Sequence, residues 1–323
     1  MQSKLKTSGP LDPGVRRNAP TTALLIPCYN AEKYLDNLRK QVDALDPKFD
    51  EILLVDDAST DGTVAKAREL GFDTRPLGSN RGPGGARNVL LQMAAADWVH
   101  FLDADDEIAP DYLRRVMPLA DGEVDVVLSG CDFVGASDRK FWRRWTYDSG
   151  DFSVNALAAA IANPVYLHCS FIRRSKALEA DGFDEVHRCY EDGDFHVRLA
   201  AAGARFRCIP DVLAFSLRHH EGSGGNELYC AKCRLDFLKE YRRYLGKVPK
   251  ELLGEALAEC GAVLHKNGDG AGSLEAFECA FQLGWQGPVS RHWALGLLAG
   301  FPGKWLRRRL FLAQYKVRNR QGA

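Results

Sequence analysis

The amino-acid sequence predicts an α/β fold, with a parallel, doubly wound sheet covered by helices on both faces and a helical C-terminal region. Two patterns predict it. From Thr22 onward, short apolar runs alternate with segments of helical periodicity four times over roughly 110 residues. After about residue 226 the periodicity is helical only. Regular alternation of strand and helix is typical of parallel sheets, whose faces the connecting helices cover.

The predicted strands are bounded by turn and capping residues. They occupy 22–27, 51–57, 72–77, 97–103 and 123–130. Among the helices between them, the segment 59–70 begins with capping residues and is ended by Gly71. Pro110 stands at the first position of a helix over 110–119. The aromatic and basic segment 141–150 is either a substrate loop or a solvated hairpin.

The chain divides into three predicted regions. Residues 1–20 are rich in proline, glycine and charge and lack the apolar stretch of a signal peptide, so we expect a flexible tail. Residues 21–225 form the α/β domain, and 226–323 form the helical region. Its end, 302–323, has seven Lys or Arg, no acid and an apolar helical face. Such a helix either lies on an anionic membrane or packs on the domain with its basic face solvated.

Composition excludes several classes of protein. Lys and Arg total 43, as do Asp and Glu, so no overall positive field points to nucleic acid. We find no apolar run of about 18 residues, so no membrane span is predicted. Nine cysteines form an odd set without a regular framework, which favours reduced thiols in a cytosolic protein.

Polar clusters follow three of the predicted strands. "PCYN" follows the first, "DDASTDG" the second and "DADD" the fourth. In open α/β sheets, ligands bind outside the carboxyl ends of the strands. Asp103, Asp105 and Asp106 supply oxygen ligands of the kind that Mg²⁺ or Mn²⁺ prefers. The alternative is a solvated turn that caps the next helix.

Five blocks together resemble the family 2 glycosyltransferases, which have the nucleotide-sugar-binding fold called glycosyltransferase A. These are "LLIPCYNAEKYL", "ILLVDDASTDGT", "NRGPGGARN", "FLDADD" and "YEDGDFHVRLAAAG", in the family's order and spacing. The resemblance covers about residues 20 to 225. It implies an inverting transfer of a sugar from a nucleoside-diphosphate sugar to an acceptor hydroxyl.

The resemblance implies a divalent metal, Mn²⁺ or Mg²⁺, at the "DADD" block. Asp103 and Asp105 match the motif that holds the metal and the donor's diphosphate and ribose, with Asp105 nearest the metal and Asp106 sharing the task. His220 in "LRHHEGS" matches a late family residue that adds a metal or diphosphate contact, and His219 could substitute for it. A structural histidine pair is the alternative.

The first two blocks match the family's nucleotide-binding loops. Four residues fall in the first loop: Pro27, Tyr29, Asn30 and Glu32. Asp56 and Asp57 match the second acidic pair, where acceptor oxygens suit a uracil N–H or a ribose hydroxyl, and Asp57 is the expected contact. The alternative for Tyr29 is a ring packed within the protein. The alternative for Asp56 and Asp57 is a turn that caps the next helix.

The glycine-rich block is not a phosphate-binding motif of the Walker type, because it has no Gly-Lys-Ser/Thr. Gly82, Gly84 and Gly85 are expected to let the chain turn before a helix. Arg87 matches the family's "ARN" and is placed in the nucleotide-sugar site. It pairs there with a site carboxylate or with phosphate, or else forms a structural ion pair.

The last block carries the implied catalytic base. Asp192 matches the residue that removes the acceptor's proton, and a position at the start of a helix favours its ionised form. Glu191 would orient or bind the acceptor. Downstream, Cys230 and Cys233 form a CxxC without a second one, so zinc is disfavoured and apolar filler on a helix is favoured.

The sequence therefore predicts an inverting, metal-dependent glycosyltransferase that uses a nucleoside-diphosphate sugar, with uridine favoured. The expected acceptor is a glycan or a lipid-linked glycan in cell-surface or polysaccharide synthesis. We expect a cytoplasmic protein, peripheral to the membrane if the basic end binds lipid. Two alternatives remain: a sugar-phosphate nucleotidyltransferase, which would want a glycine-rich basic loop after the first strand, and a catalytically inactive nucleotide-sugar-binding scaffold.

Overall fold

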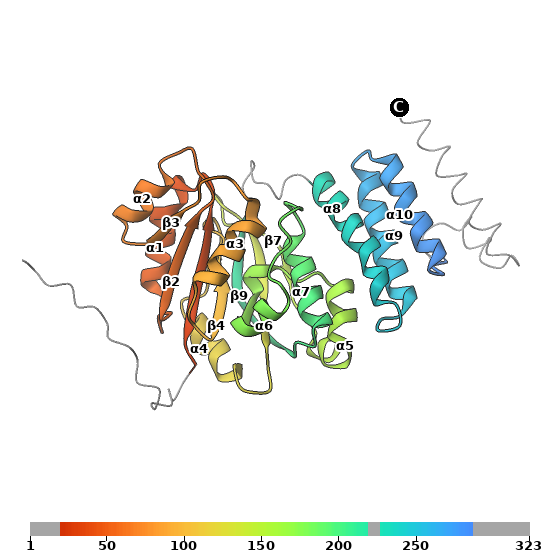
Figure 1. Cartoon of the computed structure of the whole chain (residues 1–323), viewed down its shortest axis with the longest axis horizontal. Helices are drawn as coiled ribbons and strands as arrows, with labels where there is room; N and C mark the ends of the chain where they lie inside the picture. The colour runs from red at the N-terminus through yellow and green to blue at the C-terminus, as the bar shows by residue number, and fades with distance from the viewer. Residues whose placement is uncertain (1–19, 219–226, 287–323) are drawn as a thin grey trace, which may run out of the picture.

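The computed structural model describes residues 20–218 and 227–286 (Figure 1). It confirms the α/β class and the five predicted strands. These are β1 (Thr22–Cys28), β2 (Glu51–Asp56), β3 (Asp73–Pro76), β4 (Trp98–Phe101) and β6 (Val126–Gly135). The predicted tail, except residue 20, and the basic end at 302–323 lie outside the described residues, as do His219 and His220.

The prediction of a wholly parallel sheet is wrong beyond β4. In the described part of the chain the strands form one nine-stranded mixed sheet, in the order β3-β2-β1-β4-β8-β6-β9-β5, with β7 on β6. The first four of these strands are parallel, but β8 (Ser170–Arg173) is antiparallel to both its neighbours. Apolar runs show where strands lie and carry no information on direction, and a four-residue strand gives little signal.

The remaining strands extend the far half of the sheet. They are β5 (Glu107–Ile108), β7 (Phe141–Trp145) and β9 (Phe206–Arg218). β7 pairs antiparallel with β6, and its Phe141 and Trp142 are exposed. Of the two alternatives for residues 141–150, the hairpin is therefore the structure formed by 141–145.

Helices cover both faces of the sheet, as predicted. Those of the α/β domain are α1 (Leu35–Ala44), α2 (Thr63–Glu69), α3 (Gly82–Met93), α4 (Tyr112–Val116), α5 (Ser149–Ala162), α6 (Arg174–Glu179) and α7 (Glu191–Ala201), with 3-10 turns η1 (Glu32–Tyr34), η2 (Met117–Leu119) and η3 (Leu167–Cys169). Along β1, Leu24 belongs to a core cluster with Leu35 and Leu38 of α1, whereas Leu25 belongs to the cluster with Leu90 of α3. This alternation is the period-2 pattern of a strand buried on both faces.

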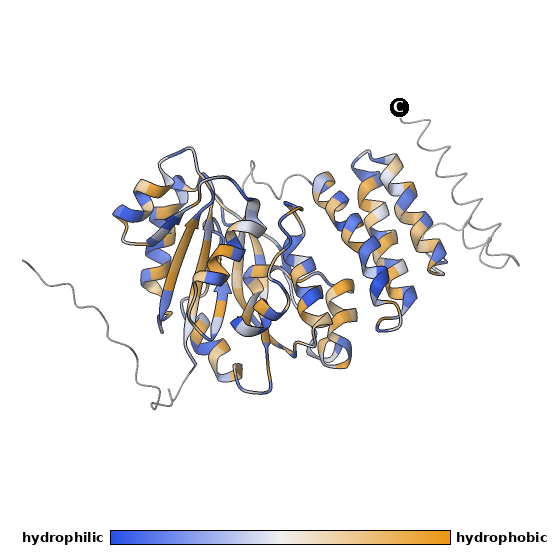
Figure 2. Cartoon of the chain, viewed as in Figure 1, coloured by the Kyte–Doolittle hydropathy of each residue, from blue (hydrophilic) through white to orange (hydrophobic). Residues whose placement is uncertain are grey.

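The helical C-terminal region is confirmed for the residues described. It consists of α8 (Glu227–Glu240), η5 (Tyr241–Tyr244), α9 (Lys250–Lys266) and α10 (Gly270–Gln282), and its three α-helices lie side by side (Figure 1). Hydrophobic residues recur along these helices (Figure 2), and Leu253, Leu257 and Leu264 of α9 are fully buried. The predicted boundary near residue 225 falls in the segment 219–226, outside the described residues. None of the described helices combines the length and apolar character needed to cross a membrane.

Candidate active site

The loops after β1 and β2 are held together by hydrogen bonds, because the two strands are neighbours in the sheet. Asn30 adopts a positive φ of 49°, and its Oδ1 accepts a hydrogen bond from the Thr60 backbone N–H at 2.9 Å. Glu32 Oε2 accepts one from the Gly62 N–H, also at 2.9 Å. Tyr29 is 54% exposed at the end of β1. Asn30 and Glu32 thus shape the loop, while Tyr29 presents a ring to solvent.

Asp56 and Asp57, the second acidic pair, are both buried, and their side chains have different roles. Asp56 accepts a hydrogen bond from the Ser59 N–H at 3.1 Å, whereas its Oδ1 has no hydrogen-bond partner among the described residues. Both oxygens of Asp57 accept backbone N–H groups at the start of α3, from Arg81 at 2.7 Å and Gly82 at 2.8 Å. Burial raises the pKa of Asp57 above its ordinary value, although these N–H groups oppose the shift. Asp57 therefore anchors the glycine-rich loop.

The glycine-rich loop is packed against protein rather than laid out as a phosphate cradle. Gly82 has a φ of 79°, a conformation that glycine adopts without strain. A Cβ on Gly84 would lie 2.1 Å from the Asp184 carbonyl oxygen. Asn88 Nδ2 donates to the Phe183 carbonyl at 2.9 Å, which ties the same two segments together. The glycines serve the turn and the close approach, in agreement with the sequence interpretation.

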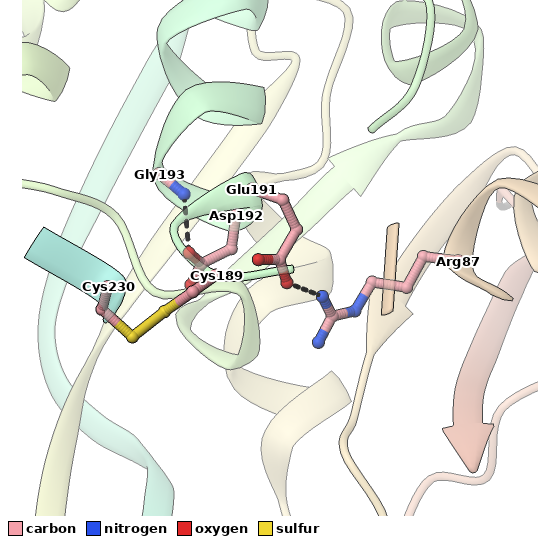
Figure 3. Close-up of a disulfide and its surroundings, with 6 residues drawn as sticks. All are labelled: Arg87, Cys189, Glu191, Asp192, Gly193 and Cys230. Carbon is pink, nitrogen blue, oxygen red and sulfur yellow. Dashed lines mark hydrogen bonds and ion pairs between the residues drawn. A yellow bond between two sulfur atoms is a disulfide. The ribbon is translucent and has the colours of Figure 1, made fainter. Parts of the chain in front are cut away.

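Arg87 connects the acidic cluster after β4 to the first turn of α7. Its Nη2 donates to both oxygens of Asp103, at 2.8 and 3.1 Å, and its Nη1 donates to Glu191 Oε1 (Figure 3). The Arg87 side chain is only 6% exposed. Burial acts to lower the pKa of Arg87, but Asp103 and Glu191 raise it above its ordinary value, so the guanidinium stays charged. The sequence left a site carboxylate, a phosphate or a structural ion pair open as the partner of Arg87. The structure shows two carboxylates of the site as its partners.

The "DADD" carboxylates differ in their surroundings. The Asp103 side chain is 40% exposed and Asp105 is partly exposed. Asp106 is buried: its Oδ1 accepts the Leu217 N–H at 2.9 Å, and its Oδ2 lies 3.3 Å from His168 Nδ1. Asp103 and Asp105 thus offer partly exposed hard oxygens at one strand end, which fit Mg²⁺ or Mn²⁺. Asp106 makes its contacts within the protein.

The acidic residues from different strand ends gather around the end of β1. Burial is the largest effect that raises the pKa of the Cys28 thiol, and the charges of Asp56, Asp103 and Asp105 raise it further. Cys28 is the last residue of β1, directly after Pro27. Carboxylates that are far apart in the chain therefore lie near one another at this edge of the sheet.

Asp192 and Glu191 form the first turn of α7. The turn follows Tyr190, whose φ of 68° places it in the left-handed region. Asp192 is partly exposed, and its Oδ1 accepts the Gly193 N–H at 2.7 Å. Burial raises the pKa of Asp192 above its ordinary value, although Arg87 and the Gly193 N–H act to lower it. The helix start, which was the basis of the sequence prediction, has the opposite effect and lowers the pKa of a carboxylate. Glu191 is buried against Arg87, and burial raises its pKa too.

A disulfide between Cys189 and Cys230 ties the residue before Tyr190 to α8 (Figure 3). The expectation that all nine cysteines are reduced is wrong for this pair, and the other seven are free. The two cysteines are 41 residues apart, so only the packing of α8 brings them together. Cys233, the second cysteine of the CxxC, is buried on α8 and agrees with the apolar-filler interpretation. Neither this disulfide nor His168 gave any signal in the sequence.

A cavity of about 540 Å³ lies between α3 and α6. Arg75, Gln92 and Asp181 are among its lining residues, and none of the strand-end carboxylates lines it. It is therefore separate from the candidate site.

The mixed sheet, the carboxylates at its strand ends and the acidic first turn of α7 define the class of this protein: a glycosyltransferase of the glycosyltransferase A fold. Residues 23–182 match the family model described as "Glycosyl transferase family 2". The chain belongs to glycosyl transferase family 2.

Relatives with curated descriptions agree with this class. The "Succinoglycan biosynthesis protein ExoO" of Rhizobium meliloti is 28% identical over 228 residues, which cover 66% of this chain and 65% of that protein. An "Uncharacterized glycosyltransferase" of Haemophilus influenzae is 35% identical over 107 residues, covering 30% of this chain and 41% of that protein. The matched segments thus cover less than two thirds of either relative.

Solved structures share the fold. The structure described as S. aureus TarS 1–349 in complex with UDP-GlcNAc has a TM-score of 0.63 at 22% identity and covers 81% of each chain. The mannosyltransferase PcManGT from Pyrobaculum calidifontis, in complex with GDP-Man and Mn²⁺, has a TM-score of 0.57 at 22% identity. That match covers 95% of this chain and 88% of the mannosyltransferase.

Proposed function

We propose that this glycosyltransferase moves a sugar from a UDP-sugar to an acceptor hydroxyl, with inversion and with the help of Mn²⁺ or Mg²⁺. The observation that carries the proposal is the position of Arg87 between Asp103 and Glu191. It joins the implied donor site and the implied base in one site. The UDP-GlcNAc complex of a similar fold supports the choice of uridine, and the Mn²⁺ complex of another supports a divalent metal.

On the donor side, the chain offers an aromatic ring and acidic side chains at the strand ends. The exposed Tyr29 ring can lie against a base, and Asp56 Oδ1, which has no hydrogen-bond partner in the described part of the chain, can accept a donor N–H or O–H. Asp103 and Asp105 would hold the metal. When bound, the metal supplies Lewis-acid stabilisation of the charge on the departing nucleoside diphosphate.

On the acceptor side, Asp192 takes the proton of the acceptor hydroxyl as its oxygen attacks the anomeric carbon. The nucleoside diphosphate leaves from the opposite face, so the anomeric configuration is inverted. The raised pKa of Asp192 brings this base closer to neutral pH, where proton transfer is more effective. Glu191 touches Arg87 rather than solvent, and we assign both a positioning role.

Calorimetric titration of the full chain tests the donor site. We expect UDP to bind in the presence of Mn²⁺, more weakly without it, and not to bind Asp105→Ala. Asp43→Ala, which changes an exposed carboxylate on α1, is the matched control and should bind UDP normally. Failure of folded wild type to bind any nucleoside diphosphate with metal present would refute the proposal. Metal-dependent binding without transfer to any acceptor would favour the scaffold alternative, and release of pyrophosphate from UTP and a sugar phosphate would favour the nucleotidyltransferase.

We further propose that the acceptor is a glycan or lipid-linked glycan at the cytoplasmic side of the membrane. The names of relatives support it, among them the succinoglycan protein and a poly(ribitol-phosphate) β-N-acetylglucosaminyltransferase. The basic end at 302–323 would then contact anionic lipid. Flotation with anionic liposomes tests this contact: the full chain should float and a chain ending at residue 301 should not. A full chain that stays wholly unbound would refute it.

A further inference from the structure

Two cysteines and a histidine meet behind the acidic cluster. Cys131 lies on β6, and His168 and Cys169 lie at the end of η3, next to β8. One potential ligand atom from each residue lies within 4.8 Å of the others, and His168 Nε2 is 3.2 Å from Cys131 Sγ. Both cysteines are fully buried and His168 is 8% exposed. Two sulfurs and an imidazole nitrogen at this spacing form a ligand set typical of soft and borderline metals.

Asp106 orients the histidine for this task. Its Oδ2 lies 3.3 Å from His168 Nδ1, while its Oδ1 is held by the Leu217 N–H. When the ring is neutral, a carboxylate that accepts the Nδ1 proton leaves the Nε2 lone pair available to a metal ion held by the two sulfurs. Most metal-binding histidines have such a carboxylate or carbonyl on their other nitrogen, which fixes the tautomer and the ring orientation.

The surroundings of the cluster are aromatic. The His168 ring is stacked on Tyr166, with 5.8 Å between centroids, and meets the edge of Phe133. The cluster differs in chemistry from Asp103 and Asp105, which offer oxygen only.

We propose that Cys131, His168 and Cys169 form a second metal site, specific for a thiophilic ion such as Zn²⁺ and distinct from the site that the acidic cluster offers to Mg²⁺ or Mn²⁺. On binding, the thiols lose their protons to solvent, and the ion takes two sulfurs and His168 Nε2. The site links β6 and η3 to Asp106 in the "DADD" block. It does not depend on the proposed function, because its readout is metal binding.

Titration with Co²⁺ as a spectroscopic substitute tests the site in the full chain. The protein is freed of metal with a chelator without reductant, after a thiol count in denaturant has shown the seven free thiols. We expect a thiolate-to-cobalt charge-transfer band that saturates at one equivalent and disappears on addition of Zn²⁺. The band should be lost in Cys131→Ser and in Cys169→Ser. It should persist in Cys208→Ser, a buried cysteine of β9 outside the cluster, and in Asp105→Ala.

Asp106→Asn tests the orienting role, and we expect it to weaken Zn²⁺ binding about 10- to 100-fold. Because the cysteine variants can fail to fold, X-ray absorption of the zinc-loaded wild type gives a second test. It should show two sulfurs at about 2.3 Å and one imidazole. A folded wild type without the cobalt band, a band that persists in Cys131→Ser, or a zinc shell without sulfur would each overturn the proposal.

Discussion

Arg87 donates to Asp103 Oδ1 at 2.8 Å and to Glu191 Oε1 at 2.5 Å, so one guanidinium joins residues 16 and 104 positions away along the chain. Asp103 lies just after β4. Glu191 is the first residue of α7 and precedes Asp192, the proposed base. The carboxylates of Asp103 and Glu191 would repel each other, and the buried guanidinium of Arg87 offsets this repulsion. The guanidinium therefore connects the proposed donor and acceptor halves of the site.

Arg87→Ala should destabilise the protein by about 3–5 kcal/mol, because it leaves Glu191 as a buried charge without its partner. Arg81→Ala is the matched control, since it breaks an exposed pair with Glu185 and should cost about 1 kcal/mol or less. Urea unfolding followed by circular dichroism measures both. Equal losses of stability in the two variants would show that Arg87 does not form a buried connection between Asp103 and Glu191.

Asp192→Asn should lower kcat/KM by about 10²- to 10⁴-fold while UDP binding stays unchanged, because the amide cannot take the acceptor's proton. Asp151→Asn, an exposed acid in the first turn of α5, is the control and should keep full activity. Steady-state kinetics with a transferable sugar and calorimetry with UDP measure the two effects. Activity within threefold of wild type would exclude Asp192 as the base.

The pH dependence of kcat/KM should report the same carboxylate. Burial raises the pKa of Asp192, so activity should fall on acidification at a higher pH than an ordinary aspartate would give. The folded state holds this proton more tightly than the unfolded state, so the stability contributed by Asp192 falls as pH rises between the two pKa values. Asp192→Asn should therefore be no less stable than wild type at neutral pH. A less stable variant, or an acid limb at the ordinary aspartate pKa, would contradict this assignment.

The disulfide should stabilise the turn that carries the base. Cys230→Ser should cost about 2–4 kcal/mol, because the bond restricts the unfolded chain over a 41-residue separation. It should also lower kcat with little change in UDP binding, since Cys189 precedes Tyr190 and the first turn of α7. Cys233→Ser, on the same helix but free, is the control and should lose less stability. Thermal unfolding with and without reductant measures the effect, and a reductant-insensitive wild type would refute it.

Gly84→Ala should destabilise the protein by at least about 1–3 kcal/mol, because the new Cβ would lie 2.1 Å from the Asp184 backbone oxygen. Gly78→Ala is the control: a Cβ there meets no atom within 4 Å. Denaturant unfolding compares the two. If Gly84→Ala were as stable as Gly78→Ala, the glycine-rich block would not be explained by close packing, and a role toward phosphate would have to be reconsidered.

Local patterns in the sequence determined the first half of the fold and most of the candidate site. Hydrophobic runs predicted β1, β2 and β4, and acidic residues directly after such runs predicted a site at their carboxyl ends. This succeeds because neighbouring parallel strands end at one edge of a sheet, so residues at strand ends meet whatever the loops do. The family resemblance then predicted that Asp192 belongs to the same site.

Only the tertiary structure decided which charges face one another. The antiparallel insertion of β8 between β4 and β6 carries His168 to Asp106, and the packing of α8 carries Cys230 to Cys189. Arg87 could have met phosphate, but burial between Asp103 and Glu191 gives it protein partners. Local periodicity shows which face of an element is buried. The order and direction of distant strands depend on long-range packing, which no short stretch of this sequence records.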